Sequence, residues 1–91
     1  MNVTLQLLGQ LRHLAGEDEL ALSVEDGASL TDFLEGVANE QGDEFTNILL
    51  DSGAIRSSMM VLVNEVPVDK SAPPALSDGD TITLLPAIAG G

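Results

Sequence analysis

A single stripe of apolar residues at helical spacing constrains this chain most. Within residues 29–42 these side chains recur at i, i+3, i+4, i+7 and i+8, which gives an amphipathic helix one apolar face. They are Leu30, Phe33, Leu34, Val37 and Ala38. Ser29 is a favoured N-cap residue and Gly42 a favoured C-terminal stop. A helix of this kind must bury its stripe against another element, so the remaining residues have to supply an apolar surface for it.

Segments with strand-like patterns lie on both sides of this helix. Residues 3–7 and 20–25 alternate apolar and polar at period two, which predicts a hairpin of half-buried strands. In its broad loop, residues 10–16 form a wide turn or a short helical turn that packs Leu11 and Leu14. Residues 59–63 and 81–85 predict two more strands, the former apolar on both faces.

Two shorter segments complete the pattern. Residues 45–49 carry apolar side chains that suggest a second short helical piece. Residues 66–68 form a short strand after the turn at Asn64-Glu65. Because Pro67 has no N–H to donate, we expect that strand at an edge.

The order is strand, strand, helix, strand, short strand, strand. A right-handed crossover through the helix places the last strand parallel to the first. We therefore predict an α+β fold of the β-grasp (ubiquitin-like) type, a mixed sheet of four to five strands with one main helix on one face. Residues 1–85 form this domain, and residues 86–91 form a flexible Gly-Gly tail.

The sequence ends in Gly90-Gly91 after a short run of small and apolar residues. Glycine has no Cβ, so such an end can pass through a narrow channel of another protein and present an unhindered carboxylate. We expect Gly91 to be the reacting residue. Gly90, Ala89, Ile88 and Pro86 would thread the channel, and Pro86 would limit how far the tail folds back.

Composition excludes several function classes. The chain has no cysteine, which rules out disulfides, thiolate metal sites and cysteine nucleophiles. Fifteen acids against three Lys and Arg residues give a net charge of −12, which repels nucleic acid and anionic membranes. The acids either solvate the surface or steer the chain towards a basic partner. The first residues lack a signal-peptide pattern and no stretch reaches transmembrane length, so we expect a cytoplasmic protein.

Four segments together resemble the ThiS/MoaD family of ubiquitin-like sulfur carriers. They are residues 11–16 (LRHLAG), 28–34 (ASLTDFL), 61–65 (VLVNE) and 78–91 (DGDTITLLPAIAGG). The resemblance covers essentially the whole chain. It implies a carrier or co-substrate protein that is not itself an enzyme, binds no cofactor or metal, and presents its own terminus as the reactant.

The resemblance also implies partners. An E1-like adenylyltransferase would use ATP to convert the Gly91 carboxylate to an acyl-adenylate. A persulfide sulfur donor would then displace AMP to leave a thiocarboxylate. The sulfur-accepting enzyme would be a molybdopterin synthase large subunit or a cysteine synthase, and the motifs do not separate these. A thiamine-pathway carrier is disfavoured, because residues 47–57 look like an insert that those chains lack.

Family members dock through the sheet face opposite the helix. If Val61, Val63, Ile82 and Leu84 point into the core, alternation sends Met60, Leu62 and Leu85 outward as an exposed apolar patch. Alternatively, the strand at 59–63 is buried on both sides, or the register is shifted by one residue.

Two other functions remain open. Gly91 could form isopeptide bonds to target lysines, as in a ubiquitin-like protein modifier, and Lys70 would then be the only acceptor side chain for chains of the protein itself. Alternatively, the domain is a β-grasp binding module with an inert tail.

The remaining polar motifs predict no chemistry. His13 has no partner motif, and Asp78-Gly79-Asp80 predicts a turn, because it lacks the further ligands of a calcium loop. Arg12 and Arg56 either contact acidic groups of a partner or balance local charge.

Overall fold

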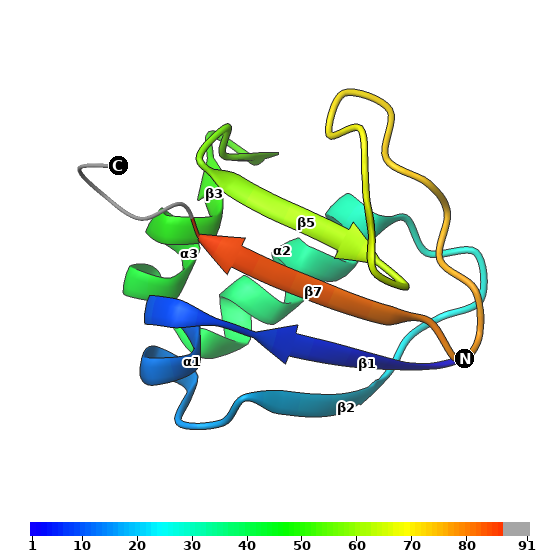
Figure 1. Ribbon diagram of the computed structural model, residues 1–91, viewed down its shortest axis with the longest axis horizontal. Coiled ribbons are helices and arrows are strands. Elements are labelled where there is room, and N and C mark those ends of the chain that lie inside the picture. The colour runs from blue at the N-terminus through cyan, green and yellow to red at the C-terminus, as the bar shows by residue number, and fades with distance from the viewer. Residues whose placement is uncertain (87–91) are drawn as a thin grey trace.

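The computed structural model describes residues 1–86 as one mixed sheet with helices packed against it (Figure 1). The elements follow in the order β1 (Asn2–Leu7), α1 (Gly9–Ala15), β2 (Glu19–Ser23), α2 (Leu30–Gln41), α3 (Asp43–Leu49), β3 (Leu50–Asp51), β4 (Ala54–Ile55), β5 (Met59–Val63), β6 (Val66–Pro67) and β7 (Thr81–Pro86). Five of the strands form the main sheet, in the order β2-β1-β7-β5-β6. The predicted α+β fold of the β-grasp type is therefore confirmed.

The last strand lies in the middle of the sheet. β7 pairs in parallel with β1 and antiparallel with β5. β1 forms the predicted antiparallel hairpin with β2, and β6 pairs antiparallel with β5 at the other edge. The parallel pair confirms the crossover predicted through the helix, and Pro67 lies in an edge strand as expected.

α2 forms where the apolar stripe predicts it. The Ser29 hydroxyl accepts a hydrogen bond from the Asp32 N–H at 3.1 Å, which satisfies one free donor of the first turn. At the other end, the Gly42 N–H donates to the Ala38 carbonyl at 3.0 Å. All five stripe residues are buried, so the helix faces the sheet with its full apolar side.

The core lies between α2 and the inner face of the sheet. It contains alternate residues of β1, β5 and β7, the stripe of α2 and buried residues of α1 and α3. The strands of the main sheet contribute Val3, Leu5, Leu7, Met59, Val61, Ile82 and Leu84. Val63 is partly buried against this core. The inward and outward directions on β5 and β7 thus follow the predicted register.

Two short helices close one end of the core. The loop at 10–16 is the helix α1, which buries Leu11, and α3 buries Phe45 and Leu49. The β3–β4 hairpin was not predicted. It turns at Ser52 and Gly53, which have φ values of 54° and 83°. A strand of two residues is too short to show periodicity in the sequence.

The hairpin between β5 and β6 turns through two residues with positive φ. Asn64 has φ 51° and Glu65 has φ 70°, as a type I′ turn requires. Asn tolerates this region, but Glu has a Cβ that makes it costly. We expect Glu65→Gly to raise the free energy of unfolding by about 0.5–1 kcal/mol, since removing the Cβ clash outweighs the extra freedom gained by the unfolded chain. Chemical denaturation followed by circular dichroism measures this, and an unchanged or lower midpoint would contradict it.

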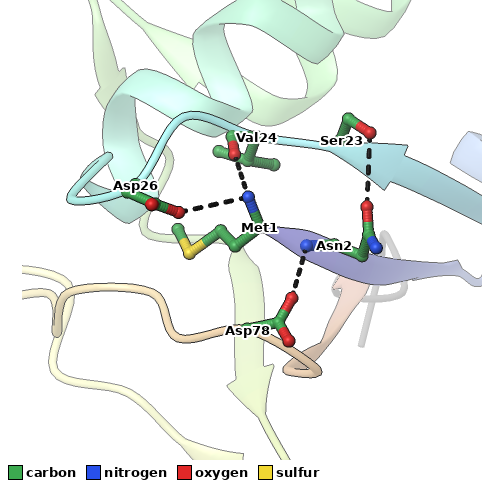
Figure 2. Close-up of polar contacts among 6 residues, drawn as sticks. All are labelled: Met1, Asn2, Ser23, Val24, Asp26 and Asp78. Atoms are coloured by element: carbon green, nitrogen blue, oxygen red, sulfur yellow. Dashed lines mark hydrogen bonds and ion pairs between the residues drawn. The ribbon is translucent and has the colours of Figure 1, made fainter.

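Polar contacts fasten the start of β1 (Figure 2). The Met1 amino group donates to the Val24 carbonyl at 2.7 Å and to the Asp26 carboxylate at 3.2 Å. The Asn2 N–H donates to the Asp78 carboxylate at 2.7 Å, and the Asn2 side-chain oxygen accepts from the Ser23 hydroxyl. These bonds join the first strand to the loop before α2 and to the turn before β7.

Asp78-Gly79-Asp80 forms the predicted turn. The Asp78 carboxylate accepts from the Asn2 N–H, as described above. The Asp80 carboxylate accepts from the Ser77 N–H at 2.8 Å and from the Asn64 side-chain amide at 2.9 Å. Both carboxylates therefore organise backbone and side-chain donors around the start of β7.

Candidate functional site

The end of β7 is held between its two neighbours. Met59 pairs with Pro86, and the Leu8 N–H donates to the Leu84 carbonyl at 3.2 Å. Pro86 therefore belongs to the strand, which runs one residue past the predicted domain boundary. The predicted threading and reacting residues Ile88, Ala89, Gly90 and Gly91 lie outside the described residues. The chain enters this segment from the middle of the sheet.

Three exposed apolar side chains surround this point, and we call them the exit patch: Leu8, Met60 and Leu85. Met60 and Leu85 are paired across β5 and β7, and they are 50% and 37% exposed. Leu62, also predicted outward, is half-buried opposite Thr83. The predicted outward directions of Met60 and Leu85 hold, so β5 is not buried on both faces at Met60.

Leu8 was missed from the sequence. It is 38% exposed and its backbone is extended, so it continues the alternation of β1 and points away from the buried Leu7. Because Leu7 pairs with Leu84, the next positions, Leu8 and Leu85, are adjacent on the outer face. The sequence signal for Leu8 is an apolar residue that directly follows an inward-facing residue, Leu7, at the end of a strand.

A groove of about 460 Å³ opens beside the exit patch. Its walls include Ser57, Ser58, Met60, Lys70, Leu85 and Pro86. One wall is thus the loop before β5, and another is the end of β7. The groove is continuous with the patch because the two share Met60 and Leu85.

Lys70 lies in the groove wall with its ammonium group held by backbone carbonyls. Its Nζ donates to the carbonyl oxygens of Arg56, Ser57 and Met59, at 3.1, 2.9 and 2.7 Å. The side chain is half-buried. An ammonium group has three donors, and all three have acceptors here.

The two arginines differ in their surroundings. Arg56 donates through Nε to the Asn47 carbonyl and through its backbone N–H to Leu49, so it ties the loop before β5 to α3. Arg12 is exposed on α1 and borders a surface hollow with acidic residues 17–19. Arg56 therefore has an internal role, whereas Arg12 is accessible to a partner.

The turn that carries Lys70 is built on Asp69. The Asp69 carboxylate accepts from the Ser71 hydroxyl and from the Ser71 N–H, and these bonds lower the pKa of Asp69 from its ordinary value of 3.8. A carboxyl group with a lowered pKa contributes stability above its unfolded value and loses it as the pH falls through the folded value. We expect Ser71→Ala to raise the pKa of Asp69 towards 3.8, because the hydrogen bond from the Ser71 hydroxyl is the largest cause of the lowered pKa. Titration of the Asp69 carboxyl carbon by NMR measures this, and an unchanged pKa would contradict it.

Two features of residues 1–86 bear on other functions. No helix in this range is long and apolar enough to cross a membrane. Nor do these residues bring together three or more His, Asp or Glu side chains in a group able to hold a metal ion.

Comparison with known proteins identifies the family. The model of the ThiS family matches residues 5–91. The chain is 29% identical to small archaeal modifier protein 3 of Haloferax volcanii, over 100% of both chains. The crystal structure of SAMP1 from Haloferax volcanii superposes with a TM-score of 0.84 over 100% of both chains, and at 22% identity it shows the shared fold.

A third relative comes from the BexX/CysO complex of Amycolatopsis orientalis. It is 27% identical, covers 98% of this chain and 99% of the matched chain, and has a TM-score of 0.74. The predicted family resemblance is confirmed, and such family members are carriers and modifiers rather than enzymes. The chain belongs to the ThiS family of ubiquitin-like sulfur carriers and modifiers.

Proposed function

We propose that this protein is a sulfur carrier whose Gly91 carboxylate is activated and converted to a thiocarboxylate. The supporting observation is the position of the exit patch. The strand that leads to the tail is central in the sheet, and Leu8, Met60 and Leu85 form an apolar surface at its end. A partner that covers this surface also receives the tail.

The chemistry needs an activating partner. A carboxylate is a poor electrophile until it carries a good leaving group, and ATP supplies that group as AMP when pyrophosphate departs. The terminal sulfur of a persulfide then bonds to the Gly91 carbonyl carbon, and AMP leaves. A thiol finally breaks the sulfur–sulfur bond, so that a disulfide forms and the thiocarboxylate is freed. The E1-like adenylyltransferase positions the tail, and positioning supplies much of the rate.

The sulfur acceptor is proposed to be a molybdopterin synthase large subunit or a cysteine synthase. Likeness to the chain from the BexX/CysO complex supports a sulfur-accepting biosynthetic enzyme as one partner. The acceptor would take sulfur from Gly91 while the exit patch remains covered. Deletion of either candidate acceptor gene in the host would decide between them, since the loaded carrier accumulates only when its own acceptor is missing.

A second function is supported by one observation. The full-length match to small archaeal modifier protein 3 favours conjugation of Gly91 to target lysines. The same acyl-adenylate serves both functions, because an amine can displace AMP as sulfur does. An immunoblot of host extract separates them: a modifier gives a ladder of larger species, whereas a carrier gives free protein or one tight complex.

The deciding measurement for the carrier is the intact mass of the protein purified from its native host. Replacing one terminal oxygen by sulfur adds about 16 Da, and the modified fraction should be visible when the activating enzyme is present. The shift should disappear when Gly91 is deleted or when residues are added after it. A Gly36→Ala variant is the matched control, because Gly36 is an exposed helical glycine with open space around its Cβ position.

Two results would contradict the carrier. One is an unmodified mass in a host that carries the activating enzyme. The other is a deletion of Gly90 and Gly91 that leaves sulfur-dependent pathways and conjugate patterns unaltered, which would support a binding module with an inert tail.

A further inference from the structure

Lys70 is the only lysine of the chain, and its ammonium group joins two loops. The side chain comes from the turn at Asp69–Ser71, after β6. Two of its three acceptors, the carbonyls of Arg56 and Ser57, belong to the loop that leads into β5, and the third, the carbonyl of Met59, belongs to the first residue of that strand. These contacts span 11 to 14 residues of sequence, so they fasten the loop from outside.

The base of Lys70 is fixed as well. The Val68 N–H donates to the Val61 carbonyl at 3.0 Å, and the Ala72 N–H donates to the Asp69 carbonyl at 3.1 Å. Together with the Ser71 contacts to Asp69, these bonds set the direction in which the lysine leaves the turn. The ammonium contacts are therefore a built feature rather than one rotamer of a free surface chain.

The loop that Lys70 holds forms part of the exit groove. Ser57 and Ser58 line the groove, and Met59 and Met60 begin the strand that pairs with the end of β7. Without the ammonium group, three carbonyls at this wall lose their common donor. We propose that Lys70 is a clamp: a positioning residue that shapes the exit groove for the partner that activates Gly91. The role of Lys70 towards this partner rests on the proposed function, because it assumes that Gly91 is activated.

The same contacts withhold Lys70 from acyl acceptor chemistry. An amine attacks an acyl carbon through a lone pair, which appears only after the ammonium loses a proton. Here each N–H of Lys70 points at a carbonyl oxygen. After loss of a proton, the nitrogen lone pair would therefore face a lone pair of that oxygen. An acyl group could reach it only by displacing the residues of the groove wall. In the folded domain, Lys70 therefore does not form an isopeptide bond with Gly91 of a second copy. The lysine that accepts Gly91 has to belong to another protein.

Amine acylation tests the clamp without any activating enzyme. The folded full chain carrying Glu40→Lys is treated with N-hydroxysuccinimide acetate, and peptide mass spectrometry follows both lysines. Glu40 is exposed on α2, so the introduced lysine serves as the internal reference. We expect Lys70 to react at least about tenfold more slowly in the folded chain, and at an equal rate in denaturant. Equal rates in the folded chain would overturn the proposal.

Positioning is tested by the kinetics of activation. With the host's adenylyltransferase, ATP–pyrophosphate exchange should show a KM for Lys70→Gln raised about tenfold, with kcat within about twofold. Lys70→Arg keeps the charge and several donors, so it should restore most of the affinity. An unchanged KM for a folded Lys70→Gln variant would refute positioning. If that variant does not fold, the acylation rates still decide whether the clamp exists.

The two proposals fail in different ways. Absence of exchange with the unaltered chain would count against activation of Gly91 and leave the acylation result intact. Fast acylation of Lys70 in the folded chain would remove the clamp and leave the carrier standing.

Discussion

Introducing glutamate at both Met60 and Leu85 is expected to raise the KM of the activating enzyme for this protein about a hundredfold. The two side chains are paired across β5 and β7, half-exposed, and directly beside the point where the chain leaves the sheet. A partner that covers them would bury two carboxylates against an apolar contact, and loss of a central apolar contact commonly costs 2 kcal/mol or more. ATP–pyrophosphate exchange at varied carrier concentration measures the effect.

The control must add the same charge elsewhere, because the chain already carries −12. Ala21→Glu with Val66→Glu also takes the net charge to −14. Ala21 is exposed on the edge strand β2, and Val66 is 64% exposed on the opposite edge strand, next to the hairpin turn. This pair should change KM by less than about threefold, as expected for charges outside a contact. If both double variants weaken activation equally, the outer face at the tail is not the docking surface.

Replacing Phe45 by alanine should lower the free energy of unfolding by about 3–5 kcal/mol. Phe45 is 1% exposed and has the largest volume among the fully buried side chains. It lies on α3, which packs against both α1 and α2. A small domain has a single modest core, so the cavity removes much of its total stability. The midpoint of thermal unfolding should fall by roughly 15–30 °C.

Circular dichroism is the suitable probe, because the chain has neither Trp nor Tyr. Phe45→Leu is the matched control and should cost less than about 1.5 kcal/mol, since most of the apolar volume is kept. A similar loss for both variants would mean that the aromatic ring itself, rather than the volume it fills, holds α3 in place.

The sheet and the main helix were predictable because their signals are local and repeated. Val3, Leu5 and Leu7 alternate with polar residues, and the stripe of α2 recurs over three turns, so each pattern has several independent residues behind it. The parallel pairing of β1 and β7 followed from the handedness of the crossover rather than from any residue. Register on β5 and β7 was also predictable, because an inward Val61 requires an outward Met60.

The elements that were missed depend on few residues or on distant contacts. The β3–β4 hairpin has two residues a strand, and Leu8 is a single position beyond a strand end. The role of Lys70 could not be inferred, because its three acceptors are backbone carbonyls, which leave no trace in residue type. Sequence therefore located the exit patch in outline, but not the groove beside it.

The parallel arrangement of β1 and β7 has a mechanical consequence. β1 begins at one end of the sheet and β7 ends at the other (Figure 1). Tension applied between the first residue of β1, Asn2, and the last residue of β7, Pro86, therefore loads the β1–β7 ladder in shear. All of its bonds then resist together, whereas a hairpin pulled from its open end gives way one bond at a time. An enzyme can therefore pull strongly on the residues that follow β7 before the domain to which they are attached unfolds.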